Sequence, residues 1–280
     1  MMATETRETH CMQSTTEIAV AELPDRYPSA LIINADDWGR DRETTNRILD
    51  CLTIGTVSST SAMVYMEDSK RAADIARERT VDCGLHLNFT SSFSGLEIPL
   101  RVREHQERIT RYLRRNKFAR TVFHPGLVSS FEYVISAQIE EFTKLFGKAP
   151  GRYDGHHHMH LCANVLFSRL IPTGAIVRRN FSFRPSEKGS LNRLYRRAID
   201  RFLAKKYQIT DYFFSLPPLE PPSRVDEILS IARRSIVELE THPVNPLEYK
   251  FLTTDLLQRR EDLSISRAYL LRRNDAALAW

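Results

Sequence analysis

Short apolar runs alternate with amphipathic stretches along the first third of the chain. The run SALIIN is too short for a helix and predicts a buried strand, whereas RETTNRILDCLTIG spaces its apolar residues for one helical face and ends in a glycine. The pattern predicts strands at 29–34, 57–65 and 81–89 and helices at 42–55 and 68–79. Strands that alternate with helices are typical of a parallel α/β architecture.

The alternation is interrupted at 91–130, a long, basic and irregular stretch that we expect to be an insertion facing the substrate. It then resumes, with strands predicted at 152–161, 175–178, 209–214 and 235–242, helices at 129–147, 163–170, 191–206 and 224–235, and a helical segment at 262–280. About seven strands in βα order predict a single domain over 29–280, a distorted (β/α) barrel resembling a TIM barrel. Residues 1–28 are polar and lack periodicity, so we expect a loose N-terminal tail.

Composition adds a soluble character and an uneven charge. Hydrophobic residues make up 42% of the chain and charged residues 27%, which excludes a wholly disordered protein. The net charge of +5 is concentrated in the stretches 101–120 and 191–206. Basic helices can attract nucleic acid, anionic lipid or phosphate-bearing small molecules. The alternative is that these stretches are solvated helix faces with no such partner. No recognisable nucleic-acid module accompanies them, which disfavours nucleic acid as a partner.

Three features favour a cytoplasmic location. No run of about 18 apolar residues is present, so a transmembrane helix is not expected. The N-terminus has no basic segment followed by an apolar block, so a secretory signal is not expected either. The four cysteines are scattered without a C-x-x-C pair and are interpreted as reduced thiols. Peripheral contact with an anionic membrane through 191–206 stays open.

The strongest chemical signal is a run of histidines. His156, His157, His158 and His160 fall within five positions. If the strand continued through them, His156, His158 and His160 would face one way and His157 the other. Three converging imidazoles need a metal ion or a carboxylate network to hold them neutral, the alternative being a hydrogen-bonded strand end without metal.

Two adjacent carboxylates end the first strand. Asp36 and Asp37 follow the apolar run LIINA, where parallel α/β folds place their active sites. One could bind a metal while the other acts as a general base, or the two could form a helix cap and turn.

Further candidates lie at other predicted strand ends. His86 in GLHLNF could join Asp37 and His156 around a divalent ion, and His242 before a proline could act as a general acid. Arg178 could bind an anionic substrate group or support the site carboxylates, and Asp154 could orient His156.

Together these motifs resemble the YdjC-like carbohydrate deacetylases. The resemblance covers roughly 30–260 and rests on NADDWG (34–39), VSSTSAMV (57–64), GLHLNFT (84–90), DGHHHMH (154–160), the strand ending in Arg178, and ELETHP (238–243). It implies a distorted (β/α) barrel that removes N-acetyl groups from sugars, chitooligosaccharides among them, with a divalent metal.

The resemblance also implies residue roles. Asp37, His86 and His156 would hold the metal and Asp36 would act as the base. His242 matches the family's HPG histidine, although Val244 stands where the family has glycine. Asp154, His158, His160 and Arg178 are left as residues that support the ligands or contact the substrate.

The expected reaction is therefore hydrolysis of an acetamide on a GlcNAc-type amino sugar, free or linked to a nucleotide or lipid. Two imidazoles and one carboxylate suit zinc, and magnesium is also compatible. The alternatives are a metal-dependent phosphoesterase or amidohydrolase on a similar barrel and a non-catalytic sugar-binding protein. A homo-oligomer is compatible with the sequence.

Overall fold

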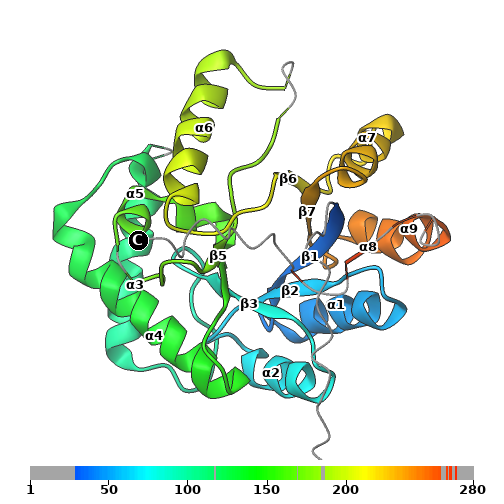
Figure 1. The fold of residues 1–280 in the computed structure, drawn as a ribbon. Coiled ribbons are helices and arrows are strands. Elements are labelled where there is room, and N and C mark those ends of the chain that lie inside the picture. Colours follow the sequence, from blue (N-terminus) through cyan, green and yellow to red (C-terminus); the bar gives the residue numbers. More distant parts are fainter. Residues whose placement is uncertain are drawn as a thin grey trace, which may run out of the picture.

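In the computed structural model, seven parallel strands form one curled sheet with helices around its outside (Figure 1). The structure describes residues 29–116, 118–168, 170–183 and 187–259, together with Leu263, Ile265, Ser266 and Tyr269. The strands are β1 (Ala30–Trp38), β2 (Ser59–Ala62), β3 (Cys83–Leu87), β4 (Arg152–Gly155), β5 (Ile176–Val177), β6 (Tyr212–Ser215) and β7 (Ile236–Thr241). Their spatial order is β5-β4-β3-β2-β1-β7-β6, which confirms the predicted α/β class and the distorted barrel.

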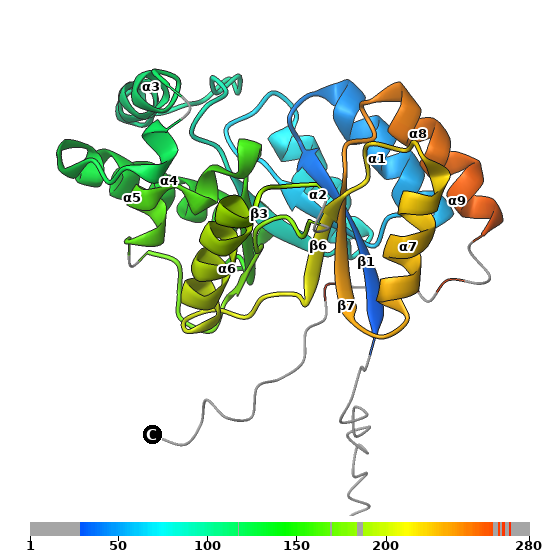
Figure 2. The same cartoon turned by 90° about the horizontal axis from the view of Figure 1, so that it is seen from above.

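The helices pack outside the curled sheet. They are α1 (Arg42–Ile54), α2 (Ser69–Glu78), α3 (Leu100–Leu113), α4 (Val128–Phe146), α5 (Ala163–Leu166), α6 (Ser190–Ala204), α7 (Pro222–Ala232), α8 (Pro246–Thr253) and α9 (Asp255–Gln258). Figures 1 and 2 both place α3, α5 and α6 on one side of the sheet and α7, α8 and α9 on the other. Local sequence explains the best-defined ends: Asp41 caps α1 by accepting a hydrogen bond from the backbone N–H of Thr44, and Gly55 ends it at a φ of 76°.

Irregular chain, rather than a strand ladder, joins the two edges of the sheet. β5 and β6 are the edge strands. Ser182, which follows β5, donates its backbone N–H to the Phe213 carbonyl at 2.7 Å, and its hydroxyl accepts the Phe213 N–H at 3.2 Å. At this seam, between β5 and β6, isolated hydrogen bonds replace the strand pairing that closes a regular (β/α) barrel. This difference is what makes the barrel distorted.

Alternation along β1 separates the two faces of the sheet. Leu31, Ile33 and Ala35 belong to the large apolar core between the sheet and the helices. Ile32 packs inside the barrel against Ile236 and Tyr269. A strand places successive side chains on opposite faces, so the interior continues upward from Ile32 through polar residues to the carboxyl end of the sheet.

Three predicted segments differ from the structure. The predicted strand 152–161 ends at Gly155, where the 3₁₀ segment η3 (His156–Leu161) begins. The stretch 91–130 is not irregular throughout, because it contains the fourteen-residue helix α3. The tail 1–28 and most of the segment 262–280 lie outside the described residues; of that segment, Leu263, Ile265, Ser266 and Tyr269 are described and are not helical.

Candidate active site

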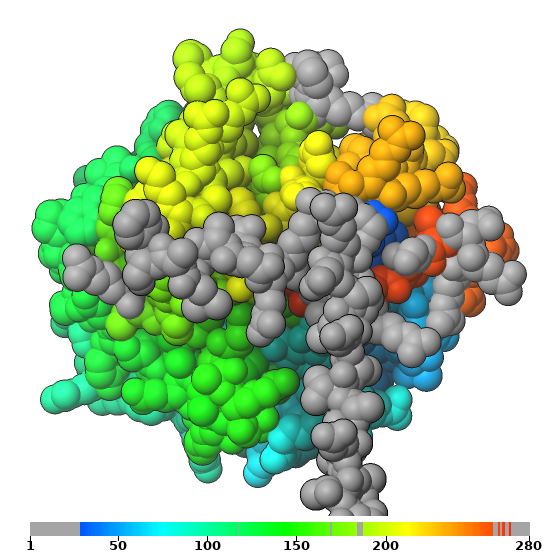
Figure 3. All heavy atoms as spheres, viewed as in Figure 1, coloured from blue at the N-terminus to red at the C-terminus, as the bar shows by residue number. Residues whose placement is uncertain are grey.

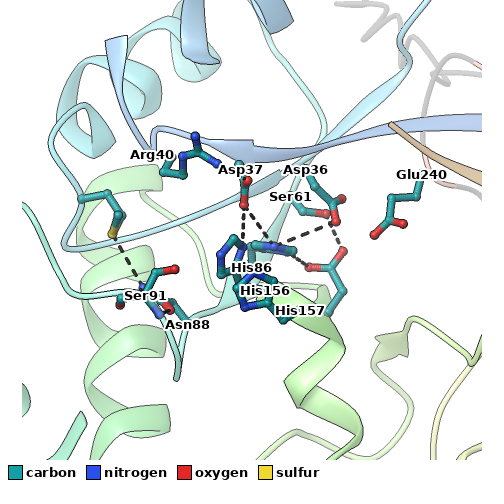
Figure 4. A network of polar contacts seen from close by, with 12 residues as sticks. Asp36, Asp37, Arg40, Ser61, His86, Asn88, Ser91, His156, His157 and Glu240 are labelled. Carbon is teal, nitrogen blue, oxygen red and sulfur yellow. Dashed lines mark hydrogen bonds and ion pairs between the residues drawn. The ribbon is translucent and has the colours of Figure 1, made fainter. Parts of the chain in front are cut away.

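The chemical residues predicted from sequence gather at the carboxyl ends of the strands. A cavity of about 310 Å³ opens there, at the small end of the range for ligand pockets. Its walls are Asp36, Asp37, Arg40, His86, His156, His157, His158, Glu240 and His242. Figure 4 shows the carboxylates of β1 facing the imidazoles from β3 and from the end of β4.

A bulge in β1 brings both aspartates into this cavity. Neighbouring residues on a regular strand point to opposite faces, so only one of Asp36 and Asp37 would reach the interior. The register between β1 and β2 shifts between Ala35 and Trp38, and Asp37 has a φ of 69°. Left-handed backbone at a non-glycine residue is strained and is frequent at functional sites. Here it turns the second carboxylate to the same side as the first.

Three donor atoms converge on one point. The Asp37 Oδ1 atom lies 2.9 Å from His156 Nδ1 and 3.4 Å from His86 Nε2. All three side chains are buried. Ligands bound at about 2.1 Å to one metal ion lie about 3.0–3.4 Å apart, depending on octahedral or tetrahedral geometry. The three donor atoms lie within 4.8 Å of one another, so together they could hold a single divalent ion.

The other ring nitrogen of His86 contacts the carboxylate of Asp154. His86 Nδ1 lies 2.8 Å from Asp154 Oδ1, and Ser61 donates its hydroxyl to the other Asp154 oxygen. A carboxylate on the far nitrogen of a metal-binding histidine fixes its tautomer and its orientation. Asp154 thus orients His86, whereas the sequence interpretation had assigned it to His156.

One guanidinium organises the carboxylates at the floor of the cavity. Arg178 donates from its two terminal nitrogens to the two oxygens of Asp36, both at 2.7 Å. It also lies 3.0 Å from Asp154 and 2.7 Å from Glu238. Burial alone would raise the pKa of Asp36, but Arg178 and His86 outweigh it and hold that pKa well below its usual range. Asp36 is therefore an ionised carboxylate with a fixed direction.

Buried carboxyl groups outnumber buried guanidiniums in the site. Buried carboxyl groups from Asp36, Asp37, Asp154, Glu238 and Glu240 surround the buried guanidiniums of Arg152 and Arg178. Burial and the nearby Asp36 raise the pKa of Glu240 well above its ordinary value. Burial lowers the pKa of His86, yet Asp36 and Asp154 raise it to about 10. The carboxylates therefore favour a positive charge at the His86 ring, which a proton supplies or a metal ion that displaces it.

The histidine run leaves the strand, so the predicted alternation of its side chains is wrong. His157 and His158 have φ values of 55° and 57°. This left-handed winding sends the three consecutive imidazoles to three places. His156 reaches Asp37, His157 Nδ1 lies 2.9 Å from the Thr90 hydroxyl, and His158 Nε2 lies 3.5 Å from Glu240.

His160 does not line the cavity. The imidazole of His160 is buried beneath the cavity, where its Nε2 atom donates to the Arg178 carbonyl at 3.0 Å. Burial lowers its pKa to about 4. His158 lines the cavity, and burial together with the Arg178 charge lowers its pKa well below the ordinary value. Both imidazoles are neutral at pH 7, as the sequence argument required, but only His158 can contact a substrate.

His242 lies at the end of β7, next to Glu240. One of its ring nitrogens lies within 4.8 Å of carboxylate oxygens of Asp36 and Glu240. Its backbone N–H donates to Glu248 at 2.8 Å, which fixes the end of the strand. The structure thus brings His242 to the same cavity as Asp36, which Val244 in place of glycine does not prevent.

Sequence reasoning missed three cavity or floor residues that carry charge. Glu238 and Glu240 are fully buried in β7, and Arg40 pairs with Asp37 at 2.9 Å. The signal for the glutamates was present, because Glu238, Glu240 and His242 alternate along an otherwise apolar strand. Arg40 carried no such signal.

A comparison with protein families agrees with this geometry. The family described as "YdjC-like protein" matches residues 30–265, which covers every residue of the cavity. The chain belongs to the YdjC-like family.

Curated relatives match about half of the chain. A carbohydrate deacetylase of Danio rerio is 29% identical over 143 residues, covering 48% of this chain and 43% of its own. Chitooligosaccharide deacetylases of Serratia marcescens and Proteus mirabilis are 31% and 32% identical, each covering about half of both chains. This YdjC-like chain therefore spans about half the length of the curated relatives it matches.

A solved structure supports the fold. The protein from Enterococcus faecalis V583 described as a cellobiose-phosphate cleavage protein superposes with a TM-score of 0.57 at 18% identity. The superposition covers 85% of this chain and 95% of the other. At this identity it shows that the two proteins share the distorted barrel.

Proposed function

We propose that this YdjC-like protein is a metal-dependent carbohydrate N-deacetylase that hydrolyses the acetamide of a GlcNAc-type amino sugar. The observation that carries the proposal is the cluster of possible metal ligands Asp37, His86 and His156 beside a carboxylate, Asp36, that is paired with Arg178. The names of the curated relatives favour the same reaction.

The donor set fits one divalent ion, with zinc and magnesium as the candidates. Held by Asp37, His86 and His156, such an ion would polarise the amide carbonyl and lower the pKa of the attacking water. Asp154 keeps His86 in the orientation that this role requires.

The chain's own residues supply the proton transfers. Asp36 accepts the proton of the attacking water, because the Arg178 guanidinium keeps it ionised and aimed into the cavity. His242 donates a proton to the departing amine. Arg40 lines the cavity and pairs with Asp37 at 2.9 Å, so it helps to fix the direction of that proposed ligand.

Arginines outside the cavity lining are candidate contacts for a substrate that carries phosphate. The electrostatic effect of Arg114, just after α3, reaches His157, and Phe183 on the other side contacts the Arg196 guanidinium at 4.9 Å. Guanidiniums bind phosphate oxygens well. We therefore include amino sugars linked through diphosphate to a nucleotide or lipid, and we place the reaction in the cytoplasm.

The test is acetate release from N-acetylated sugars, free and diphosphate-linked, by metal-stripped protein with each divalent ion added back. We expect Asp36→Asn to keep the metal and lose roughly 10²–10⁴-fold in kcat, the usual contribution of a general base. His156→Ala should lower the metal content, and Asp74→Asn, at an exposed ion pair on α2, should change neither.

Two results would contradict the proposal separately. An active, metal-loaded Asp36→Asn variant would remove the base role from Asp36. If no sugar releases acetate while one metal ion is bound per chain, the site must hydrolyse a different type of bond.

A further inference from the structure

Segments from three parts of the sequence form one exposed surface that is both apolar and cationic. They are residues 118–123, Phe167 and the outer side of α6, and we call them the basic apolar face. α5 and η1 (Ala119–Thr121) contact each other, and α6 lies beside them (Figures 1 and 2). This face lies on the opposite side of the sheet from α7, α8 and α9.

Large apolar side chains are exposed across the face. Phe118, Phe167 and Leu191 are 63%, 62% and 84% exposed. Ring contacts join its segments: Phe167 lies 6.0 Å from Phe123 and 5.9 Å from Phe202 on α6. Phe123, Phe167 and Phe202 are therefore in contact across the three segments, and exposed apolar groups gathered in this way mark interaction sites.

The helix α6 has the pattern of an interfacial helix. Leu191, Leu194 or Tyr195, Ala198 and Phe202 recur at helical spacing along one stripe. Leu203 and Asp200 are buried against the protein, so this stripe faces outward. Arg197 and Arg201 border it and are exposed. Figure 3 shows α6 at the outer edge of the molecule.

The charge of the face is almost entirely positive. The sequence between Arg108 and Phe131 contains no acidic residue, and the only one in 188–206 is Asp200. The carboxylate of Asp200 accepts hydrogen bonds from Arg179 and Asn180, so it does not neutralise the outer arginines. Burial and the nearby Arg120 guanidinium lower the pKa of Arg196, which places cations of η1 and α6 close together.

An aromatic connection leads from α6 to the cavity. Phe181 contacts His158 with ring centroids 4.5 Å apart, and Phe183 contacts Phe181 at 6.1 Å. Phe183 in turn lies under the Arg196 guanidinium of α6. Arg196 shares the protein-facing side of α6 with Asp200 and Leu203, so the connection runs to the cavity from the inner side of the helix, behind the exposed stripe.

We propose that the basic apolar face docks on an anionic lipid bilayer. The apolar stripe of α6, Phe118 and Phe167 would enter the boundary between headgroups and acyl chains, and the arginines would contact lipid phosphates. No helix in the described part of the chain has the length and apolar character to cross a membrane. Docking would hold the protein at a membrane, where amino sugars carried by lipids are found, which deepens the proposed function without depending on it for its own test.

The test is sedimentation of the full chain with vesicles of phosphatidylcholine alone or with about one third phosphatidylserine. We expect binding to the anionic vesicles that weakens with salt. Leu191→Ser/Leu194→Ser and, separately, Arg197→Gln/Arg201→Gln should each lower the bound fraction at least fivefold. All four side chains are exposed, so the variants should fold and keep their turnover of a free N-acetylated sugar.

The matched controls lie on the other side of the molecule. Leu247→Ser on α8 and Arg233→Gln/Arg234→Gln after α7 change exposed residues of the same types and should bind vesicles like the unchanged protein. Asp36→Asn should also bind fully, so a failed deacetylase and a failed membrane contact give different results.

Three outcomes would overturn the membrane assignment. Equal binding to neutral vesicles, or equal losses in the controls, would show unspecific adsorption. Binding to heparin that needs the arginines but not the leucines would indicate a soluble polyanion. Self-association lost in Leu191→Ser/Leu194→Ser, with no vesicle binding, would make the face an interface between two copies of the chain.

Discussion

At the residue scale, His160 couples the stability of the fold to pH. Its imidazole is 1% exposed, and its Nδ1 atom has no hydrogen-bond partner in the described structure. Burial lowers its pKa to about 4 from an ordinary value of 6.5. Between these two values the unfolded chain binds a proton at this position and the folded chain does not.

The sign of the effect follows from that difference. The contribution of His160 is complete above pH 6.5 and is lost as the pH falls toward 4, by at most about 3 kcal/mol. We predict that His160→Gln, which keeps a donor for the Arg178 carbonyl but does not titrate, reduces the fall in urea midpoint between pH 7.5 and pH 5. The exposed His124→Gln should leave it unchanged. An unaltered pH dependence in His160→Gln would contradict the assignment.

The proposed site residues could be predicted individually, because each lies within or just after a predicted strand. Asp36, Asp37, His86, His156 and His242 lie at one cavity, as expected. Which oxygen meets which nitrogen could not be predicted. The pairing of these atoms depends on the positive φ of Asp37, and an aspartate at this position does not by itself predict a bulge.

At the element scale, the turn from β4 into the histidine run requires a glycine at 155. A Cβ atom there would lie 2.9 Å from the backbone nitrogen of His160, closer than such contacts normally come. The φ of Gly155 is −166°, which any residue adopts, so the requirement is for space alone. The turn positions His156 on one side and His160 on the other.

We predict that Gly155→Ala lowers the free energy of unfolding by about 1–3 kcal/mol, the usual cost of overpacking, and weakens metal binding as well. Gly151→Ala is the matched control, since a Cβ at Gly151 meets nothing within 4 Å. Chemical denaturation and metal titration would measure both effects. If the Gly155→Ala protein is as stable as the control, the turn accommodates a Cβ atom and does not require glycine.

This turn also explains where element prediction failed. Three consecutive histidines after a short strand do not distinguish continued strand from a left-handed turn, because histidine tolerates the left-handed region better than most residues. The helix α3 was missed for another reason. Its buried positions, Val102, Gln106, Ile109 and Leu113, include one glutamine, which weakens the apolar periodicity.

At the scale of the whole molecule, the order of strands and helices predicted the barrel, but not how its interior is filled. Short-range periodicity predicts which face of a helix or strand is buried. It does not predict which residues from distant parts of the sequence contact that face. The interior charges come from β1, β4, β5 and β7, so their pairing depends on the closed curvature of the sheet. The C-terminal segment adds a further distant part of the chain.

Tyr269 closes the lower end of this interior. Its hydroxyl donates to Glu238 at 2.5 Å, and the Arg152 guanidinium lies 4.4 Å from its ring centroid. Glu238 accepts in turn from Arg178, whose other nitrogens hold Asp36. A hydrogen-bonded chain thus runs from the C-terminal segment to the proposed catalytic base through the centre of the barrel.

We predict that Tyr269→Phe, which removes only the hydroxyl, reduces kcat several-fold with little change in KM. Loss of the hydrogen bond leaves a Glu238 oxygen buried without a donor, costs about 1–3 kcal/mol of stability, and raises the pKa of Glu238 further. A Glu238 that binds a proton holds Arg178, and through it Asp36, less firmly. Tyr249→Phe, which breaks a tyrosine–aspartate hydrogen bond at the surface, is the control. Equal losses of stability in both variants, with kcat unchanged in Tyr269→Phe, would show that the segment seals the barrel without positioning the base.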